Sequence, residues 1–246
     1  MNRILRKDFG LAVISFALAI VVSANPAIDS LKSILNNSTG FDRIEILIEL
    51  SSNYKDENIR ESIRYASIAT ELTEDSGNII LGAKAYNNLG DYYQSIGVYD
   101  SAIVAYNRSV ELYAQLRNEE LSSSVISKIG ELSLITGDFS MALDFMIKSL
   151  LLKENEGDLD GTGNGYLNVA RVLHSINDYD QALEYYLKGL TYFEQVDNKT
   201  KIGETLWRIG LIKSLQHNIE EAEENFQQAI VHKAFRRFGI NAQTIC

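Results

Sequence analysis

The chain of 246 residues has very little of the residue chemistry that builds disulfide and zinc sites. Cys246 is its only cysteine, so no intramolecular disulfide can form, and no Cys/His zinc spacing is present. The three histidines, His174, His217 and His232, are too far apart in sequence to pair at the spacing of ligands on one helix. We therefore expect no metal and no cofactor.

Proline is almost absent, because Pro26 is the only one. Proline interrupts helices, so more than 200 residues without one are most simply explained as helix following helix. The composition, with 46% hydrophobic and 23% charged residues, is ordinary for a folded chain and does not indicate disorder.

Positive charge is scarce, with 23 basic against 33 acidic residues and a formal net charge of −10. Nucleic-acid binding requires a basic footprint that displaces counterions, and the sequence does not supply one. The acidity is explained by solubility, and the alternative explanation is a basic partner.

The first 24 residues have the features of a secretory signal peptide. Arg3, Arg6 and Lys7 precede an apolar run from Leu11 to Val22, and small residues end the segment at Ala24. The run has 12 residues, whereas a membrane-spanning helix needs about 20. We expect residues 1–24 to be cleaved and the mature protein to be exported, periplasmic or secreted, without stable membrane insertion. The alternatives are an uncleaved anchor that tethers the protein to a membrane, and a buried helix.

The remainder is organised by a repeat of 40 residues. Six columns of like residues stay in phase over four units. They are the small residues Gly90, Gly130, Ala170 and Gly210; the alanines Ala102, Ala142, Ala182 and Ala222; the large residues Tyr99, Phe139, Tyr179 and Ile219; the large residues Tyr106, Met146, Tyr186 and Phe226; the small residues Ser109, Ser149, Gly189 and Ala229; and the polar turn residues Asn78, Asn118, Asp158 and Asn198.

Each column has a packing explanation within a pair of helices. Gly90 and its equivalents are expected where a second helix crosses closely, since a larger side chain would hold the two helices apart. Gly97, Gly137, Asn177 and His217 fall at the turn between the two helices, where a left-handed backbone is common. His217 fits that turn imperfectly. Between Tyr99 and Tyr113, the large residues follow the spacing of three and four that is typical of a buried helical stripe.

These columns resemble the tetratricopeptide repeat family. Its pattern of a large residue, Leu-Gly, Tyr, Ala, an aromatic residue and a small residue is matched in order by Tyr86, Leu89, Gly90, Tyr93, Ala102, Tyr106 and Ser109. The family's usual repeat has about 34 residues, so the 40-residue unit resembles its long-helix branch, with helices longer by roughly a turn and a half.

The resemblance implies an all-α fold, a right-handed solenoid of about five antiparallel helix pairs. We expect an N-terminal capping segment over residues 25–42, an array over 43–235 and an irregular tail over 236–246. The repeats are expected near 43–76, 77–116, 117–156, 157–196 and 197–235. The first of them is atypical, because Leu50 stands at the position of Gly90.

The resemblance also implies that the first helix of each unit lines a concave groove that binds a protein or peptide. The column register places twelve residues there: Lys84, Asn87, Asn88, Asp91, Gln94, Lys128, Glu131, Asn168, Arg171, His174, Trp207 and Arg208. The competing explanation for any one of them is a solvated helix face. Trp207 could equally anchor a ligand or pack against a neighbouring helix. The lysine clamp that some family members use is broken, since its column holds Asn87, Ser127, Leu167 and Trp207.

The alternative function is an enzyme or metal-binding domain that uses residues 156–165, read as a loop of glycines and acids. This segment lacks the lysine of a nucleotide-binding loop and the twelve-residue calcium pattern. We therefore expect no catalytic residue and no enzyme activity.

The arrangement of a signal peptide followed by these repeats also resembles the extracytoplasmic input region of bacterial sensor histidine kinases and related regulators. In those proteins a membrane helix and a signalling domain follow the repeats, whereas the repeat pattern here is lost after about His232. The protein is interpreted either as a severed sensory input or as an exported adaptor. An uncapped last unit would also allow self-association.

Overall fold

The computed structural model describes residues 25–232, and every regular element in that range is an α-helix. The helices are α1 (Pro26–Leu35), α2 (Gly40–Asn53), α3 (Ile59–Ser76), α4 (Ile79–Ser95), α5 (Tyr99–Gln115), α6 (Glu119–Thr136), α7 (Phe139–Glu156), α8 (Leu159–Ser175), α9 (Tyr179–Gln195), α10 (Lys199–Leu215) and α11 (Ile219–Val231). The all-α prediction is confirmed.

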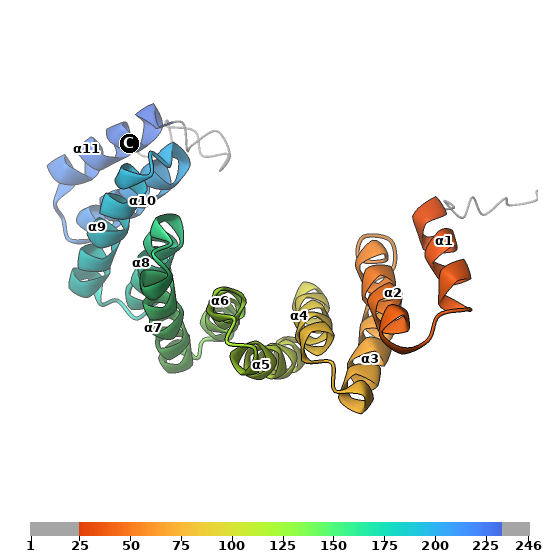
Figure 1. Ribbon diagram of the computed structural model, residues 1–246. Coiled ribbons are helices and arrows are strands. Elements are labelled where there is room, and N and C mark those ends of the chain that lie inside the picture. Colours follow the sequence, from red (N-terminus) through yellow and green to blue (C-terminus); the bar gives the residue numbers. More distant parts are fainter. Residues whose placement is uncertain (1–24, 233–246) are drawn as a thin grey trace, which may run out of the picture.

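The helices form five pairs that follow one another along an arc (Figure 1). The pairs are α2 with α3, α4 with α5, α6 with α7, α8 with α9 and α10 with α11, and each pair also packs on the next. The first helices, α2, α4, α6, α8 and α10, lie along the inner side of the arc, which we call the concave face (Figure 1). The second helices lie along the outer side.

Polar residues at the turns between pairs begin the helices that follow. Asn78, Asn118, Asp158 and Asn198 each accept a hydrogen bond from the backbone N–H three residues later, at 2.9 to 3.2 Å. Such a side chain satisfies an N–H group that has no partner within the helix. This column, predicted as turn residues, therefore consists of helix N-caps.

Left-handed residues end the helices at both kinds of turn. Gly97, Gly137, Asn177 and His217 have φ between 62° and 82°, as the turn prediction requires. The turns between pairs use the same conformation at Gly77, Arg117, Gly157 and Asp197. The fold therefore imposes this backbone even where the residue is not glycine.

His217 should consequently be replaceable by glycine with a gain in stability. A residue with a Cβ atom is strained at its φ of 62°, and its side chain is exposed, so little packing is lost. We expect His217→Gly to raise the free energy of unfolding by about 1 kcal/mol, measured by urea denaturation. Asn177→Gly is the matched control and should gain less, because asparagine tolerates this conformation. A loss of stability in His217→Gly would contradict the explanation.

The predicted close crossing at Gly90 is confirmed. A Cβ atom built there would lie 2.5 Å from two ring carbons of Tyr106, and one at Gly210 would lie 2.7 Å from the ring of Phe226. In these pairs the second helix thus lays a large side chain directly on the backbone of the first. This contact holds the two helices of a pair together.

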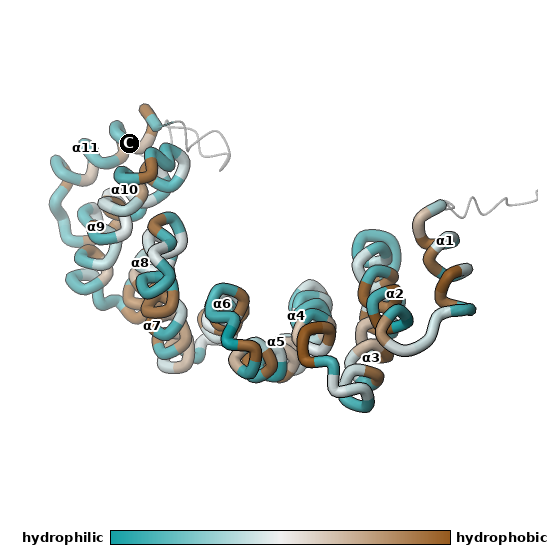
Figure 2. Tube along the Cα trace, in the orientation of Figure 1, coloured by the Kyte–Doolittle hydropathy of each residue, from teal (hydrophilic) through white to brown (hydrophobic). Residues whose placement is uncertain are grey.

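The hydrophobic core is spread along the array rather than gathered at one centre. Buried residues in the described range form four clusters, one after another from α1 to α11. Figure 2 accordingly shows hydrophobic and hydrophilic residues interleaved along the helices. This arrangement is typical of a solenoid, in which each unit is stabilised by its neighbours.

The predicted signal peptide over 1–24 and the tail over 236–246 lie outside the described residues. Between residues 25 and 232, no helix is both long and apolar enough to span a membrane.

Candidate functional site

Side chains from successive first helices meet on the concave face. Lys128 of α6 donates a hydrogen bond to Asn87 Oδ1 at 3.0 Å, and its Nζ lies 2.6 Å from Asp91 Oδ1, both on α4. The ion pair is partly exposed, with 29% of the Lys128 and 32% of the Asp91 side chain accessible. Three of the residues predicted for the site are therefore brought together across two repeats, and they satisfy one another.

Tyr106 adds a second layer beneath this ion pair. Its hydroxyl group donates to Asp91 Oδ1 at 2.6 Å and lies 2.7 Å from Gln94 Oε1. Lys128 Nζ lies 5.3 Å from the centre of the Tyr106 ring, which is fully buried. Burial, followed by the charges of Asp91 and Glu131, raises the pKa of Tyr106, so its hydroxyl remains a donor.

The sequence predicted Tyr106 only as a bulky residue between helices. Its column belongs to the second helix, so its hydroxyl was not expected to reach the concave face. The available signal was the choice of tyrosine at Tyr106 and Tyr186, where the other two repeats have Met146 and Phe226 without a hydroxyl group. A buried tyrosine hydroxyl usually requires a partner.

A different group of residues lies around Tyr186, the equivalent of Tyr106 two repeats later. Arg208 of α10 pairs with Glu204 Oε1 at 3.1 Å, and Lys201 lies 3.2 Å from the other oxygen of Glu204. Burial raises the pKa of Glu204, but Lys201 and Arg208 hold it below its ordinary value. Arg171 of α8 donates to Asn168 Oδ1 at 3.2 Å.

His174 lies close to Arg208. Burial, followed by the charge of Arg208, lowers the pKa of His174, so its imidazole is neutral at pH 7. Its ring packs edge-on against Tyr179, with 5.6 Å between ring centroids. Four predicted residues, Asn168, Arg171, His174 and Arg208, thus belong to one neighbourhood on α8 and α10.

The remaining predicted residues lie along the same helices. Lys84 is exposed on α4, and Asn88 donates to Ser52 of α2 at 3.3 Å. Glu131 is half-buried on α6 and close enough to Tyr106 to affect its pKa. Trp207 is half-buried and packs against the core cluster that contains Tyr186 and Phe193. Packing, one of the two roles that the sequence left open for Trp207, is therefore present, and ligand anchoring stays a prediction.

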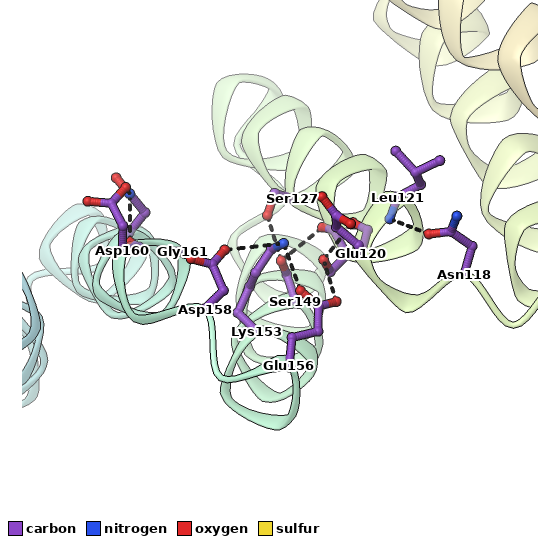
Figure 3. A network of polar contacts seen from close by, with 12 residues as sticks. Asn118, Glu120, Leu121, Ser127, Ser149, Lys153, Glu156, Asp158, Asp160 and Gly161 are labelled. Atoms are coloured by element: carbon purple, nitrogen blue, oxygen red, sulfur yellow. Dashed lines mark hydrogen bonds and ion pairs between the residues drawn. The ribbon is translucent and has the colours of Figure 1, made fainter. Parts of the chain in front are cut away.

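The interpretation of residues 156–165 as a loop was wrong. Gly157 forms the turn with φ 70°, Asp158 is the N-cap, and α8 begins at Leu159. Lys153 lies between Glu156 at 3.0 Å and Asp158 at 3.5 Å (Figure 3). Gly163 and Gly165 are helical, and added Cβ atoms there would meet Phe193 at 2.8 Å and Leu150 at 2.9 Å. These glycines allow helix packing, which explains the glycine-rich segment without a ligand.

Within the described residues, no group of three or more His, Cys, Asp or Glu side chains is placed to hold a metal ion.

The fold and the concave face define a class of proteins, the helical repeat scaffolds. A model of the tetratricopeptide repeat matches residues 121–195, and a model of the soluble NSF attachment protein family matches residues 42–149. The repeats of this protein are tetratricopeptide repeats, as the columns indicated.

Two curated relatives support this assignment at low identity. The Arabidopsis thaliana protein kinesin light chain-related 2 is 24% identical over 162 residues, which are 62% of this chain and 24% of that protein. A probable vesicular-fusion protein, the sec17 homolog of Schizosaccharomyces pombe, is 24% identical over 185 residues, 75% of this chain and 62% of its own length. The chain thus spans less than two thirds of either relative.

Solved structures show the same fold. BtubC (BKLC) from P. vanneervenii has a TM-score of 0.73 at 15% identity, covering 89% of this chain and 91% of its own. A signal transduction ATPase with numerous domains from Pyrococcus horikoshii, which has a tetratricopeptide repeat sensor, has a TM-score of 0.71 at 20% identity, covering 80% and 31%. The tetratricopeptide fold is in general a non-catalytic scaffold for protein interaction.

Proposed function

We propose that this protein binds an extended segment of a partner protein along its concave face and catalyses no reaction. The observation that supports the proposal is the set of polar side chains carried by the first helices, from Asn88 on α4 to Arg208 on α10, since these helices line the inner side of the arc. An extended segment that lies across several repeats would meet acids, bases and amides in turn.

We further propose that the protein works outside the cytoplasm, as an adaptor or as the sensory input of a signal-transduction protein. The expected signal peptide over 1–24 supports export. Cleavage after Ala24 would leave Asn25 in place, and Asn25 caps α1 by accepting from Ala27 N at 3.1 Å and donates to Glu57 at 2.7 Å. The fold shared with the tetratricopeptide repeat sensor of the Pyrococcus horikoshii protein supports a sensory role.

Site-specific crosslinking tests where the partner binds. A photoreactive amino acid replaces Lys84, which is exposed on the inner helix α4, or Lys148, which is exposed on the outer helix α7. Both positions remove one exposed lysine, so they form a matched pair. We expect partner crosslinks at position 84 to exceed those at position 148 several-fold. Equal yields, or a higher yield at position 148, would place binding elsewhere.

The N-terminus of the protein expressed for crosslinking tests whether the protein is exported. Protein recovered from the exported fraction should begin at Asn25, as measured by intact mass. Recovery of the protein only from the cytoplasm, with Met1 or Asn2 first, would contradict the adaptor and sensor proposals while leaving the crosslinking result valid.

A further inference from the structure

The second and fourth helix pairs can be compared residue by residue, because equivalent positions are 80 residues apart in the sequence. In the second pair, the Tyr106 hydroxyl faces Asp91 and Gln94, and the next repeat adds Lys128. At the equivalent positions, the fourth pair has Tyr186, Arg171 and His174, and the next repeat adds Arg208. One carboxylate has thus been replaced by an arginine, while the tyrosine and the cation from the next repeat are kept.

This replacement leaves a buried donor without an acceptor. Tyr186 is fully buried, Arg208 is the only described side chain placed to donate to its hydroxyl oxygen, and the hydroxyl proton has no acceptor among the described residues. Arginine has only donor groups, so neither Arg171 nor Arg208 can accept from it. Arg208 Nε is likewise buried with no hydrogen-bond partner among the described residues. An unsatisfied buried donor destabilises the fold, and this loss is recovered when an acceptor arrives.

The charges around the hydroxyl favour an anion as that acceptor. Burial raises the pKa of Tyr186, and the nearby charges of Arg208 and Arg171 oppose the increase. Glu204 is the only acid among the groups that influence Tyr186, and it is already shared by Lys201 and Arg208. Two cations, Lys201 and Arg208, therefore share one carboxylate here, and Arg171 adds a third positive charge near Tyr186. In the second pair, by contrast, Lys128 is matched by Asp91.

The equivalent position in the second pair is partly open to solvent. Asp91 contacts the buried Tyr106 hydroxyl and still exposes 32% of its side chain. In the fourth pair Arg208 exposes 25% of its side chain, so a carboxylate can reach Arg208 from solvent. Contact with the buried Tyr186 hydroxyl then requires the side chains of Arg171 and Arg208 to move aside.

We propose that Tyr186, Arg171 and Arg208 form a binding site for a carboxylate group of the partner, which takes the place that Asp91 occupies in the second pair. The site rests on the proposed function, because it supplies one specific contact within the concave face. The carboxylate belongs to an aspartate or glutamate side chain or to the C-terminus of the partner. Donors from two arginines and a tyrosine would hold it with charge-assisted hydrogen bonds.

NMR titration of the histidines tests the site directly, since His174 adjoins Arg208 and the protein has only three histidines. The probes are N-acetylglycine, which carries a C-terminal carboxylate, and N-acetylglutamate amide, which carries a side-chain carboxylate. Sodium chloride keeps the ionic strength constant. We expect a saturable shift of the His174 resonance and a rise of its pKa, because a bound anion offsets Arg208. His217, exposed in the turn after α10, should shift less than His174.

Arg171→Asp provides the decisive variant, because it restores the carboxylate of the second pair. The new side chain should accept a hydrogen bond from Tyr186 and pair with Arg208. We therefore expect a higher urea concentration at the midpoint of unfolding and probe binding weaker by about tenfold or more. Arg171→Gln should weaken binding without the gain in stability. Lys84→Gln, which removes a cation elsewhere on the concave face, should change neither result.

The outcomes separate this inference from the proposed function. If neither probe shifts His174 more than chloride does, or if Arg171→Asp binds as wild type does, the carboxylate site is wrong. Concave crosslinks at position 84 would then still support the proposed function. If the probes bind as expected but no crosslink forms at position 84, the carboxylate site is supported and the proposed partner surface is wrong.

Discussion

Replacing Gly90 with alanine should destabilise the array by about 2 kcal/mol, although alanine is the better helix former. The added methyl group would lie 2.5 Å from the Tyr106 ring. That ring cannot move aside, because it is fully buried and its hydroxyl is tied to Asp91 and Gln94. Overpacking of this kind costs about 1–3 kcal/mol or more, and helix propensity returns only about 1 kcal/mol.

The equivalent change in the next repeat is the matched control. An alanine at Gly130 would meet the flexible Met146 side chain at 3.0 to 3.1 Å, and Met146 has no hydroxyl to anchor it. Gly130→Ala should therefore be neutral or gain up to about 1 kcal/mol. Urea denaturation followed by circular dichroism measures both variants. Equal destabilisation in the two variants would show that the rigidity of Tyr106 is not the cause.

The repeat columns predicted the fold because they record backbone packing. A position such as Gly90 is small since another helix crosses there, and this requirement returns in every unit at the same phase. Six such columns fix the helix period, the pairing and the turn between paired helices. The left-handed turn at Gly97 and Gly137 follows from the same reasoning. His217 has the same left-handed backbone, because the fold imposes this turn whichever residue stands there.

The side-chain partners on the concave face could not be predicted in the same way. The register placed Asn87, Asp91 and Lys128 on this face, but not the bonds that join them, since those depend on the distance between adjacent repeats. Tyr106 was assigned to packing because its hydroxyl reaches the face from the second helix. Composition also led to the wrong interpretation of residues 156–165. The glycines there lie in helix α8 and allow neighbouring helices to pack closely, instead of forming a loop.

Truncation of Phe193 should have the largest effect of any single change considered. Its ring is fully buried in the core cluster of the last three pairs and lies against the Gly163 backbone. Phe193→Ala should cost about 3–5 kcal/mol through lost burial and a residual cavity. Trp207 is the only tryptophan and packs against the same cluster, so its fluorescence reports unfolding of this region.

A double-mutant cycle with Gly163 shows whether the ring itself excludes a side chain at that position. Alone, Gly163→Ala should cost about 1 kcal/mol, because its Cβ atom would meet Phe193 at 2.8 Å. In the Phe193→Ala background the obstacle is gone, so the same change should stabilise by about 1 kcal/mol through helix propensity. The two substitutions should thus couple by about 2 kcal/mol. Additive effects would mean that the glycine column is set by something other than the side chain lying on it, and the packing explanation of the 40-residue repeat would fail at this unit.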